Sequence, residues 1–119
     1  MRKKNSIRIE IYTEREFERQ LRKLAKKYRS IIKDYGKFLD ELEANPYQGS
    51  DLGNGIRKVR MAIASKGKGK SGGARVITYH LVQQQDTLVI DLLTIYDKGE
   101  MSCISDEFIQ YLLERRTQV

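Results

Sequence analysis

Three stretches typical of β-strands follow one another closely in the second half of the chain. They are residues 56–64 (IRKVRMAIA), 74–82 (ARVITYHLV) and 87–96 (TLVIDLLTIY), which are rich in β-branched and aromatic residues. The connections between them are too short for the crossover that parallel strands need, so we expect an antiparallel meander. Apolar residues fall on both faces of 87–96, which predicts an interior strand covered on both sides.

The first half of the chain predicts a strand followed by two helices. Residues 6–12 alternate between apolar and polar, which is typical of a half-buried strand with Ile7, Ile9 and Ile11 on one face. Thr13 and Glu16 have the spacing of a helix capping box. Apolar residues at helical spacing then predict helices over about 14–28 and from Ile31 to about residue 43, where Asn45-Pro46 blocks further helix.

A last helix is expected to begin at Ser105, because two acids follow it and suit the helix N-terminus. Its apolar stripe is Phe108, Ile109, Leu112 and Leu113. The predicted order is β-α-α-β-β-β-α. A helical hairpin separated from a block of strands indicates an α+β fold, and 119 residues without a linker or repeat fit one domain over residues 1–119.

Composition excludes several classes of protein. One cysteine, Cys103, and one histidine, His80, rule out a disulfide framework and a zinc site built mainly from these residue types. We therefore expect no metal and no cofactor. The N-terminal residues lack the apolar region of a signal peptide, and no run of about 18 apolar residues occurs, so a cytoplasmic protein without a membrane partner is expected.

The positive charge is concentrated in one segment. Seven basic residues and no acid lie between Asp51 and Asp86, and seven equals the formal net charge of +7. The 16 basic residues elsewhere are matched by 16 acidic ones. Such a local field attracts phosphate groups. The seven are Arg57, Lys58, Arg60, Lys66, Lys68, Lys70 and Arg75.

The glycine-rich stretch at residues 65–73 partly matches a nucleotide-binding P-loop, because Gly69-Lys70-Ser71 follows a strand pattern. A P-loop must lead into a helix whose N-terminus holds the phosphates. Here Gly72-Gly73 and a second strand pattern follow instead, so a nucleotide-binding site is not expected. Two interpretations of the loop remain, namely a solvated flexible connection and one side of a groove for a polyanion.

Two blocks of the sequence, LGNGIRKVRMAIASKGKGKSGGARVITYHL and LLTIYDKGEMSCIS, resemble the RelE/ParE superfamily of bacterial toxins, and most of all its HigB-like branch. The resemblance covers about residues 52–104. It implies a RelE-like fold in which the helical hairpin packs on a curved antiparallel sheet. For this branch it also implies the toxin of a type II toxin–antitoxin system, an mRNA interferase that inhibits translation by cutting mRNA on the ribosome.

The resemblance also implies partners and site residues. The expected partners are the ribosome with its mRNA and a cognate antitoxin, a HigA-like helix-turn-helix protein. Metal-independent cleavage through the ribose 2′-OH needs a base, cations for the developing charge and an acid. The candidate catalytic residues are Lys58 as a base, Arg60 and Arg75 as phosphate clamps, Lys98 at the scissile phosphate, and Tyr96 for proton transfer or stacking.

Other residues are expected to contact RNA or to have structural roles. Arg57, Lys66, Lys68 and Lys70 are candidates for binding ribosomal RNA. The C-terminal tyrosine of some family members has no match, since Ser102 and Ser105 occupy that region. We expect core or sheet packing for Tyr79 and His80, and a buried position for Cys103.

Two other functions remain open from the sequence. Members of the ParE branch poison DNA gyrase and are not nucleases, and fold alone does not distinguish the branches. A non-catalytic or decayed toxin-like binding module is the third possibility.

Overall fold

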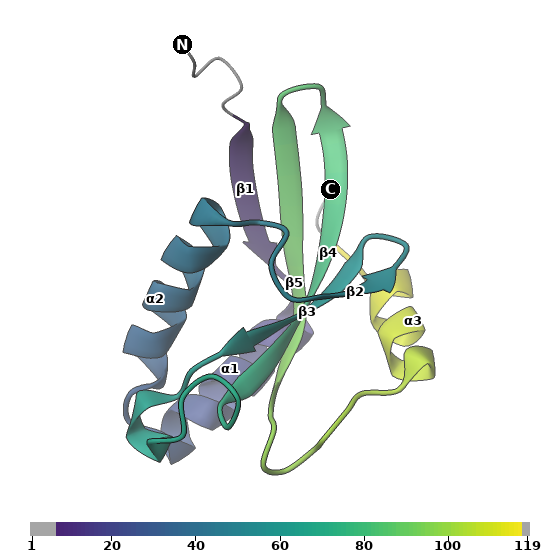
Figure 1. Cartoon of the computed structure of the whole chain (residues 1–119). Helices are drawn as coiled ribbons and strands as arrows, with labels where there is room; N and C mark the ends of the chain where they lie inside the picture. The colour runs from purple at the N-terminus through teal and green to yellow at the C-terminus, as the bar shows by residue number, and fades with distance from the viewer. Residues whose placement is uncertain (1–6, 118–119) are drawn as a thin grey trace.

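The structure, a computed structural model, describes residues 7–117, apart from the side chains of residues 82 and 83. Its five strands form one sheet in the order β1-β5-β4-β3-β2. Helices α1 and α2 cover one face of this sheet, and α3 covers the other (Figure 1). In chain order the elements are β1 (Arg8–Thr13), α1 (Arg15–Lys27), α2 (Ile31–Ala44), β2 (Ser50–Gly53), β3 (Ile56–Met61), a 3-10 turn (Ala64–Lys66), β4 (Ala74–Gln84), β5 (Thr87–Asp97) and α3 (Asp106–Glu114).

Strand β5 lies between β1 and β4, and every one of its residues is buried. Ile90 and Leu92 pack into the core under α1 and α2, whereas Leu93 and Tyr96 pack into the core under α3. The prediction of an interior strand covered on both sides is therefore confirmed. A strand with two buried faces can be apolar on both, which explains its pattern.

The predicted helices form close to their expected limits. Phe17 of α1 and Phe38 of α2 are buried against the sheet, and the Phe17 and Tyr35 rings lie 5.6 Å apart where the two helices meet. Ser105 is the N-cap of α3, because its hydroxyl oxygen accepts a hydrogen bond of 3.1 Å from the Phe108 amide. The predicted α+β class is thus present in the structure.

The sheet is mixed, which corrects the expectation of a wholly antiparallel one. Strand β1 pairs in parallel with β5, from Arg8 beside Thr87 to Thr13 beside Leu92. The other pairs, β5 with β4, β4 with β3 and β3 with β2, are antiparallel. The chain crosses over through both helices between β1 and the remaining strands, and a pairing made over such a distance leaves no local sequence pattern.

Strand β2 is an addition to the predicted order. Its sequence SDLG contains turn-forming residues and all four positions are exposed, so it lacks the pattern of a strand. Strand β3 is shorter than predicted and ends at Met61, which pairs with Ala74, the first residue of β4. Residues after Met61 have no partner strand, because the glycine-rich loop lies opposite them.

The start of α1 also differs from its prediction. Thr13 is the last residue of β1, and Glu14 is the N-cap residue but makes no capping hydrogen bond with its side chain. The predicted capping box is therefore wrong, and Glu16 instead pairs with Arg19 at 2.6 Å. Ile7 is half exposed, and residue 6 of the predicted strand lies outside the described residues.

We predict that Gly49 is required for β2 to pair with β3. Both Gly49 and Gly53 have a φ of +91°, but a Cβ on Gly49 would lie 2.4 Å from the Lys58 carbonyl oxygen, whereas a Cβ on Gly53 would meet nothing within 4 Å. Gly49→Ala should lower the free energy of unfolding by about 3 kcal/mol and Gly53→Ala by about 1 kcal/mol. Urea denaturation measures both, and equal losses would contradict the role of close backbone approach.

Candidate nucleic-acid interface

The register of the three antiparallel strands places predicted site residues in one row. Arg60 of β3 lies opposite Arg75 of β4, and Arg75 lies opposite Tyr96 of β5. Directly opposed residues share a face of the sheet, and Lys58 shares it too, because it is two residues from Arg60. This is the face on which α3 packs, since Tyr96 belongs to the core under α3.

A groove of about 510 Å³ lies along this row. No acidic side chain of the described residues lines it, whereas five cationic side chains do. A concave surface with charge of one sign concentrates the electrostatic potential and attracts anions. The lining residues come from the segment before β2, from β2 itself, from β3, from the glycine-rich loop, from β4 and from the segment after β5: Gln48, Gly49, Ser50, Lys58, Val59, Arg60, Lys70, Arg75, Lys98 and Ser102.

Arg75 is the buried cation of this groove and is only 5% exposed. Its Nη1 atom donates to the carbonyl oxygens of Lys70 and Ala74, both at 3.1 Å, and its Nη2 atom donates to that of Ser71 at 3.0 Å. Burial and the charge of Arg60 lower the pKa of Arg75, although a guanidinium remains protonated in proteins. Arg75 therefore holds the glycine-rich loop in place and adds positive charge beneath it.

Tyr96 lies next to Arg75 and is 7% exposed. Its hydroxyl is buried and has no hydrogen-bond partner among the residues that the structure describes. Burial raises the pKa of Tyr96, while the charge of Arg75 opposes this change. The side chain is thus a neutral phenol packed in the core, with a polar atom directed at no other described group.

Lys58, Arg60 and Lys98 present the accessible cations of the groove. Arg60 and Lys98 are exposed and Lys58 is half-buried. The amide of Lys98 donates to the Gly73 carbonyl oxygen at 3.0 Å, which ties the turn after β5 to the end of the glycine-rich loop. Lys70 also lines the groove, and its ammonium lies 3.1 Å from the Glu41 carboxylate of α2.

The other predicted RNA-binding residues, Arg57, Lys66 and Lys68, do not line the groove. Arg57 donates to the carbonyl oxygens of Gln48 and Gly49, at 3.1 and 3.2 Å, so it fixes the chain before β2. Lys66 is 13% exposed and forms an ion pair with Asp97 at 2.8 Å. Lys68 is exposed but does not line the groove. The structure therefore gives Arg57 and Lys66 structural contacts that the sequence did not predict.

Asp97 is a further important residue, and sequence reasoning missed it. Its carboxylate is 2% exposed and accepts hydrogen bonds from Lys66 Nζ at 2.8 Å, the Gly99 amide at 2.9 Å and the Tyr28 hydroxyl at 2.5 Å. Burial alone would raise the pKa of Asp97, but these three hydrogen bonds lower it to about 2. The carboxylate thus joins α1, the 3-10 turn and the turn that contains Lys98.

The single histidine is not part of the groove. His80 is half-buried, and its ring packs edge-on against Tyr47 with 5.1 Å between the ring centroids. Burial and the nearby charge of Arg57 lower the pKa of His80. Tyr79 packs against the core under α3, as predicted. Cys103 is exposed, so the prediction of a buried position for it is wrong.

No protein-family model matches the sequence. Within residues 7–117, no group of three or more His, Cys, Asp and Glu side chains could hold a metal ion. None of the helices in that part of the chain is both long and apolar enough to cross a membrane. The fold and the groove define an α+β protein whose mixed sheet presents a cationic groove, lined by no acidic side chain of residues 7–117.

We predict that Asp97 stabilises the fold in its ionised form. Because its pKa is lowered from 3.8 to about 2, its contribution is present above pH 4 and is lost as the pH falls toward 2. Asp97→Asn should therefore lower the free energy of unfolding at pH 7 by about 2 kcal/mol. Denaturant titrations of both proteins between pH 2 and pH 7 measure the difference, which should shrink at the acid end.

Asp40→Asn is the matched control, since Asp40 is exposed on α2. It should change the free energy of unfolding by less than about 0.5 kcal/mol at any pH. If Asp97→Asn lowers the free energy of unfolding by the same amount at pH 2 and pH 7, packing rather than charge explains the effect.

Proposed function

We propose that this chain is the toxin of a type II toxin–antitoxin system and acts as a ribosome-dependent mRNA interferase. The observation that carries the proposal is a groove lined by no acidic side chain of the described residues, in which Lys58 and Arg60 of β3 meet Lys98 from the segment after β5. The resemblance of residues 52–104 to HigB-like toxins supports the same function. A groove with one sign of charge suits the backbone of single-stranded RNA.

The proposed reaction needs no metal ion. The ribose 2′-oxygen attacks the adjacent phosphorus, its proton passes to a base, and the 5′-oxygen leaves with a proton, which yields a cyclic phosphate and a free 5′-hydroxyl. We assign the base to Lys58, which shares one face of the sheet with Arg60. Arg60 and Lys98 stabilise the additional negative charge of the phosphorane, and Arg60 can do so with two parallel hydrogen bonds.

Unlike Lys58, Arg60 and Lys98, the candidates Arg75 and Tyr96 are buried. Arg75 already donates three hydrogen bonds to carbonyl oxygens, and Tyr96 lies in the core under α3. We therefore assign Arg75 to positioning the glycine-rich loop and supplying charge, and Tyr96 to packing beside Arg75 in the core under α3. Ser102 lines the groove where some relatives are expected to have a tyrosine, so the ammonium of Lys98 is the proton donor we assign to the leaving oxygen.

The ribosome has a specific part in this proposal. Neither an imidazole nor a carboxylate of the described residues lines the groove, so the protein supplies charge but few proton-transfer groups. An RNA strand held in reactive geometry by the ribosome would make up for this, because orientation alone accelerates such reactions. We assign contact with ribosomal RNA to Lys68 and Lys70 of the loop. The same function implies a cytoplasmic location and a HigA-like antitoxin.

We predict that Arg60 and Lys58 are required for cleavage. The chain should be expressed alone in bacterial cells and the 5′ ends of mRNA mapped after induction. Wild type should produce new 5′ ends within coding regions, and Arg60→Ala or Lys58→Ala should reduce them about 100-fold, the usual effect of removing one charge-stabilising or proton-transfer group. Arg60→Lys should restore part of the activity, since the charge returns without the planar guanidinium.

Lys23→Ala is the control, because it removes one exposed cation from α1, outside the groove. It should cut mRNA like wild type at equal protein levels. Growth arrest with intact mRNA and induced DNA damage would point instead to a gyrase poison. Unchanged growth with wild-type protein would indicate a non-catalytic or decayed toxin.

A further inference from the structure

The outward side of α2 carries two residues that do not serve the packing of this chain. Ile32 is 66% exposed, the largest exposed fraction among the large apolar side chains that the structure describes. Gly36 lies one turn later on the same face, and a Cβ there would meet nothing within 4 Å. Because glycine inside a helix destabilises it relative to alanine, Gly36 has a cost that no contact of the described residues explains.

The charges on this side of α2 are also unfavourable for the helix itself. Lys33 and Lys37 are both exposed, and like charges one turn apart repel each other. Lys33 also lies in the first turn of α2, where the helix dipole disfavours a cation. Glu41, one turn after Lys37, forms its ion pair with Lys70 of the glycine-rich loop instead. Within residues 7–117, neither Lys33 nor Lys37 has an ion-pair partner.

Most of the charge around these residues is positive. Residues 19–39 contain eight basic residues and one acid, Asp34. Asp34 is buried, and its Oδ2 atom accepts hydrogen bonds from the Ser30 hydroxyl at 2.6 Å and the Ala64 amide at 3.1 Å. Asp40 is the first exposed acid of α2 that follows. We call Ile32, Lys33, Gly36 and Lys37 the α2 patch, and none of them lines the cationic groove.

The composition of the α2 patch favours a protein partner over a nucleic acid. A phosphate backbone would use the two lysines, but it has no use for an exposed isoleucine. A protein segment buries Ile32 as an apolar anchor, and its backbone can come close to the helix at Gly36, where no side chain intervenes. Unpaired lysines beside the anchor complement carboxylates, so the matching segment is acidic.

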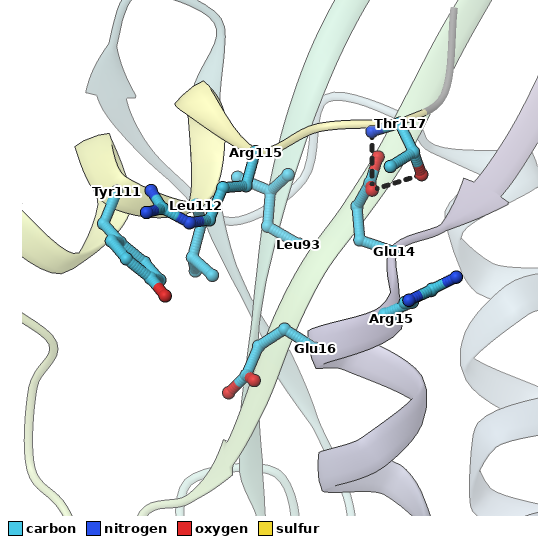
Figure 2. Close-up of a pocket in the computed structure, with 8 residues that line it drawn as sticks. All are labelled: Glu14, Arg15, Glu16, Leu93, Tyr111, Leu112, Arg115 and Thr117. Atoms are coloured by element: carbon cyan, nitrogen blue, oxygen red, sulfur yellow. Dashed lines mark hydrogen bonds between the residues drawn. The ribbon is translucent and has the colours of Figure 1, made fainter.

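The cavity between the start of α1 and α3, of about 310 Å³, is less suited to such a partner (Figure 2). Leu93 and Leu112 give it apolar surface, but its charged lining residues balance. One of its acids, Glu14, already accepts two hydrogen bonds of 3.0 Å from Thr117, as the dashed lines in Figure 2 show. Charge complementarity with an acidic segment therefore favours the α2 patch. The charged residues of the cavity are Glu14, Arg15, Glu16 and Arg115.

We propose that the α2 patch is the docking site for an acidic segment of a partner protein. An apolar side chain of that segment packs on Ile32, its backbone lies against Gly36, and its carboxylates pair with Lys33 and Lys37. Burial of Ile32 and neutralisation of the two lysines then offset the costs that these residues impose on the free helix. The identification of this partner as the cognate antitoxin rests on the proposed function.

The dissociation constant of the complex with the protein encoded by the adjacent reading frame tests the docking site. It should be measured by biolayer interferometry in an Arg60→Ala background, so that the chain does not arrest its host. Ile32→Ser should weaken binding about 30-fold or more, the usual effect of removing an apolar anchor. Lys33→Glu combined with Lys37→Glu should weaken it about tenfold or more and reduce its dependence on salt.

Gly36→Gln separates binding from stability. Glutamine favours a helix more than glycine does, so this variant should have a higher midpoint of urea denaturation. Its side chain should nevertheless keep the partner from the helix and weaken binding about tenfold or more. If Gly36→Gln raises the midpoint and binds like the parent chain, close approach at Gly36 is refuted and the docking site falls.

Arg15→Glu combined with Arg115→Glu is the matched control, because it reverses the same number of exposed charges at the cavity of Figure 2. It should bind within about threefold of the parent chain. Equal losses in the two double variants would show that only net charge matters, and this result would overturn the docking site. Failure of the adjacent protein to bind the parent chain would overturn it as well.

Mapping of mRNA 5′ ends separates this inference from the proposed function. With Arg60 restored, Ile32→Ser should cut mRNA like wild type while binding the adjacent protein weakly. Loss of cleavage with unchanged binding would assign the α2 patch to the ribosome and overturn the docking site. Binding that depends on Ile32, in a chain whose wild type leaves mRNA intact, would refute the interferase but support the docking site.

Discussion

Burial of β5 on both faces is the constraint on which the other elements depend. A strand with two apolar faces needs a layer on each side, and these layers are the α1–α2 hairpin and α3. Two acids of this strand, Asp91 and Asp97, are buried with it. Each forms an ion pair with a cationic side chain from outside the sheet. Because a buried charge is costly without a partner, Lys66 and Arg116 fix the segments that contain them. The same strand thereby anchors the loop beside the groove and the segment after α3.

The cationic groove follows from strand register combined with one interior arginine. Pairing of β3, β4 and β5 aligns Arg60, Arg75 and Tyr96, so the positive row exists as soon as the sheet forms. Mutual repulsion of these charges opposes the arrangement. Carbonyl oxygens of the loop offset this repulsion by accepting hydrogen bonds from the Arg75 guanidinium. A buried cation is therefore possible although no acid of the described residues lines the groove.

The sequence predicted local features better than distant contacts. Periodicity correctly predicted α1, α2, α3 and the interior β5, and the two-residue period placed Lys58 and Arg60 on one face. It missed β2, whose SDLG sequence resembles a turn, and the parallel pairing of β1, which arises after a crossover of two helices. Charge alone could not separate Arg57 and Lys66 from groove residues, since their carbonyl and carboxylate partners are apparent only in three dimensions. The RelE-like identity of the fold and the catalytic roles stay predictions.

The small size of β2 has a consequence for the behaviour of the chain in a crowded solution. A sheet edge exposes unpaired amides and carbonyls that can template another chain. Here the edge strand has four residues, its register with β3 shifts between Asp51 and Gly53, and an exposed acid stands on it. These features offer only a short, irregular and charged template, so edge-to-edge aggregation of folded copies is disfavoured on the side of the sheet nearest the groove.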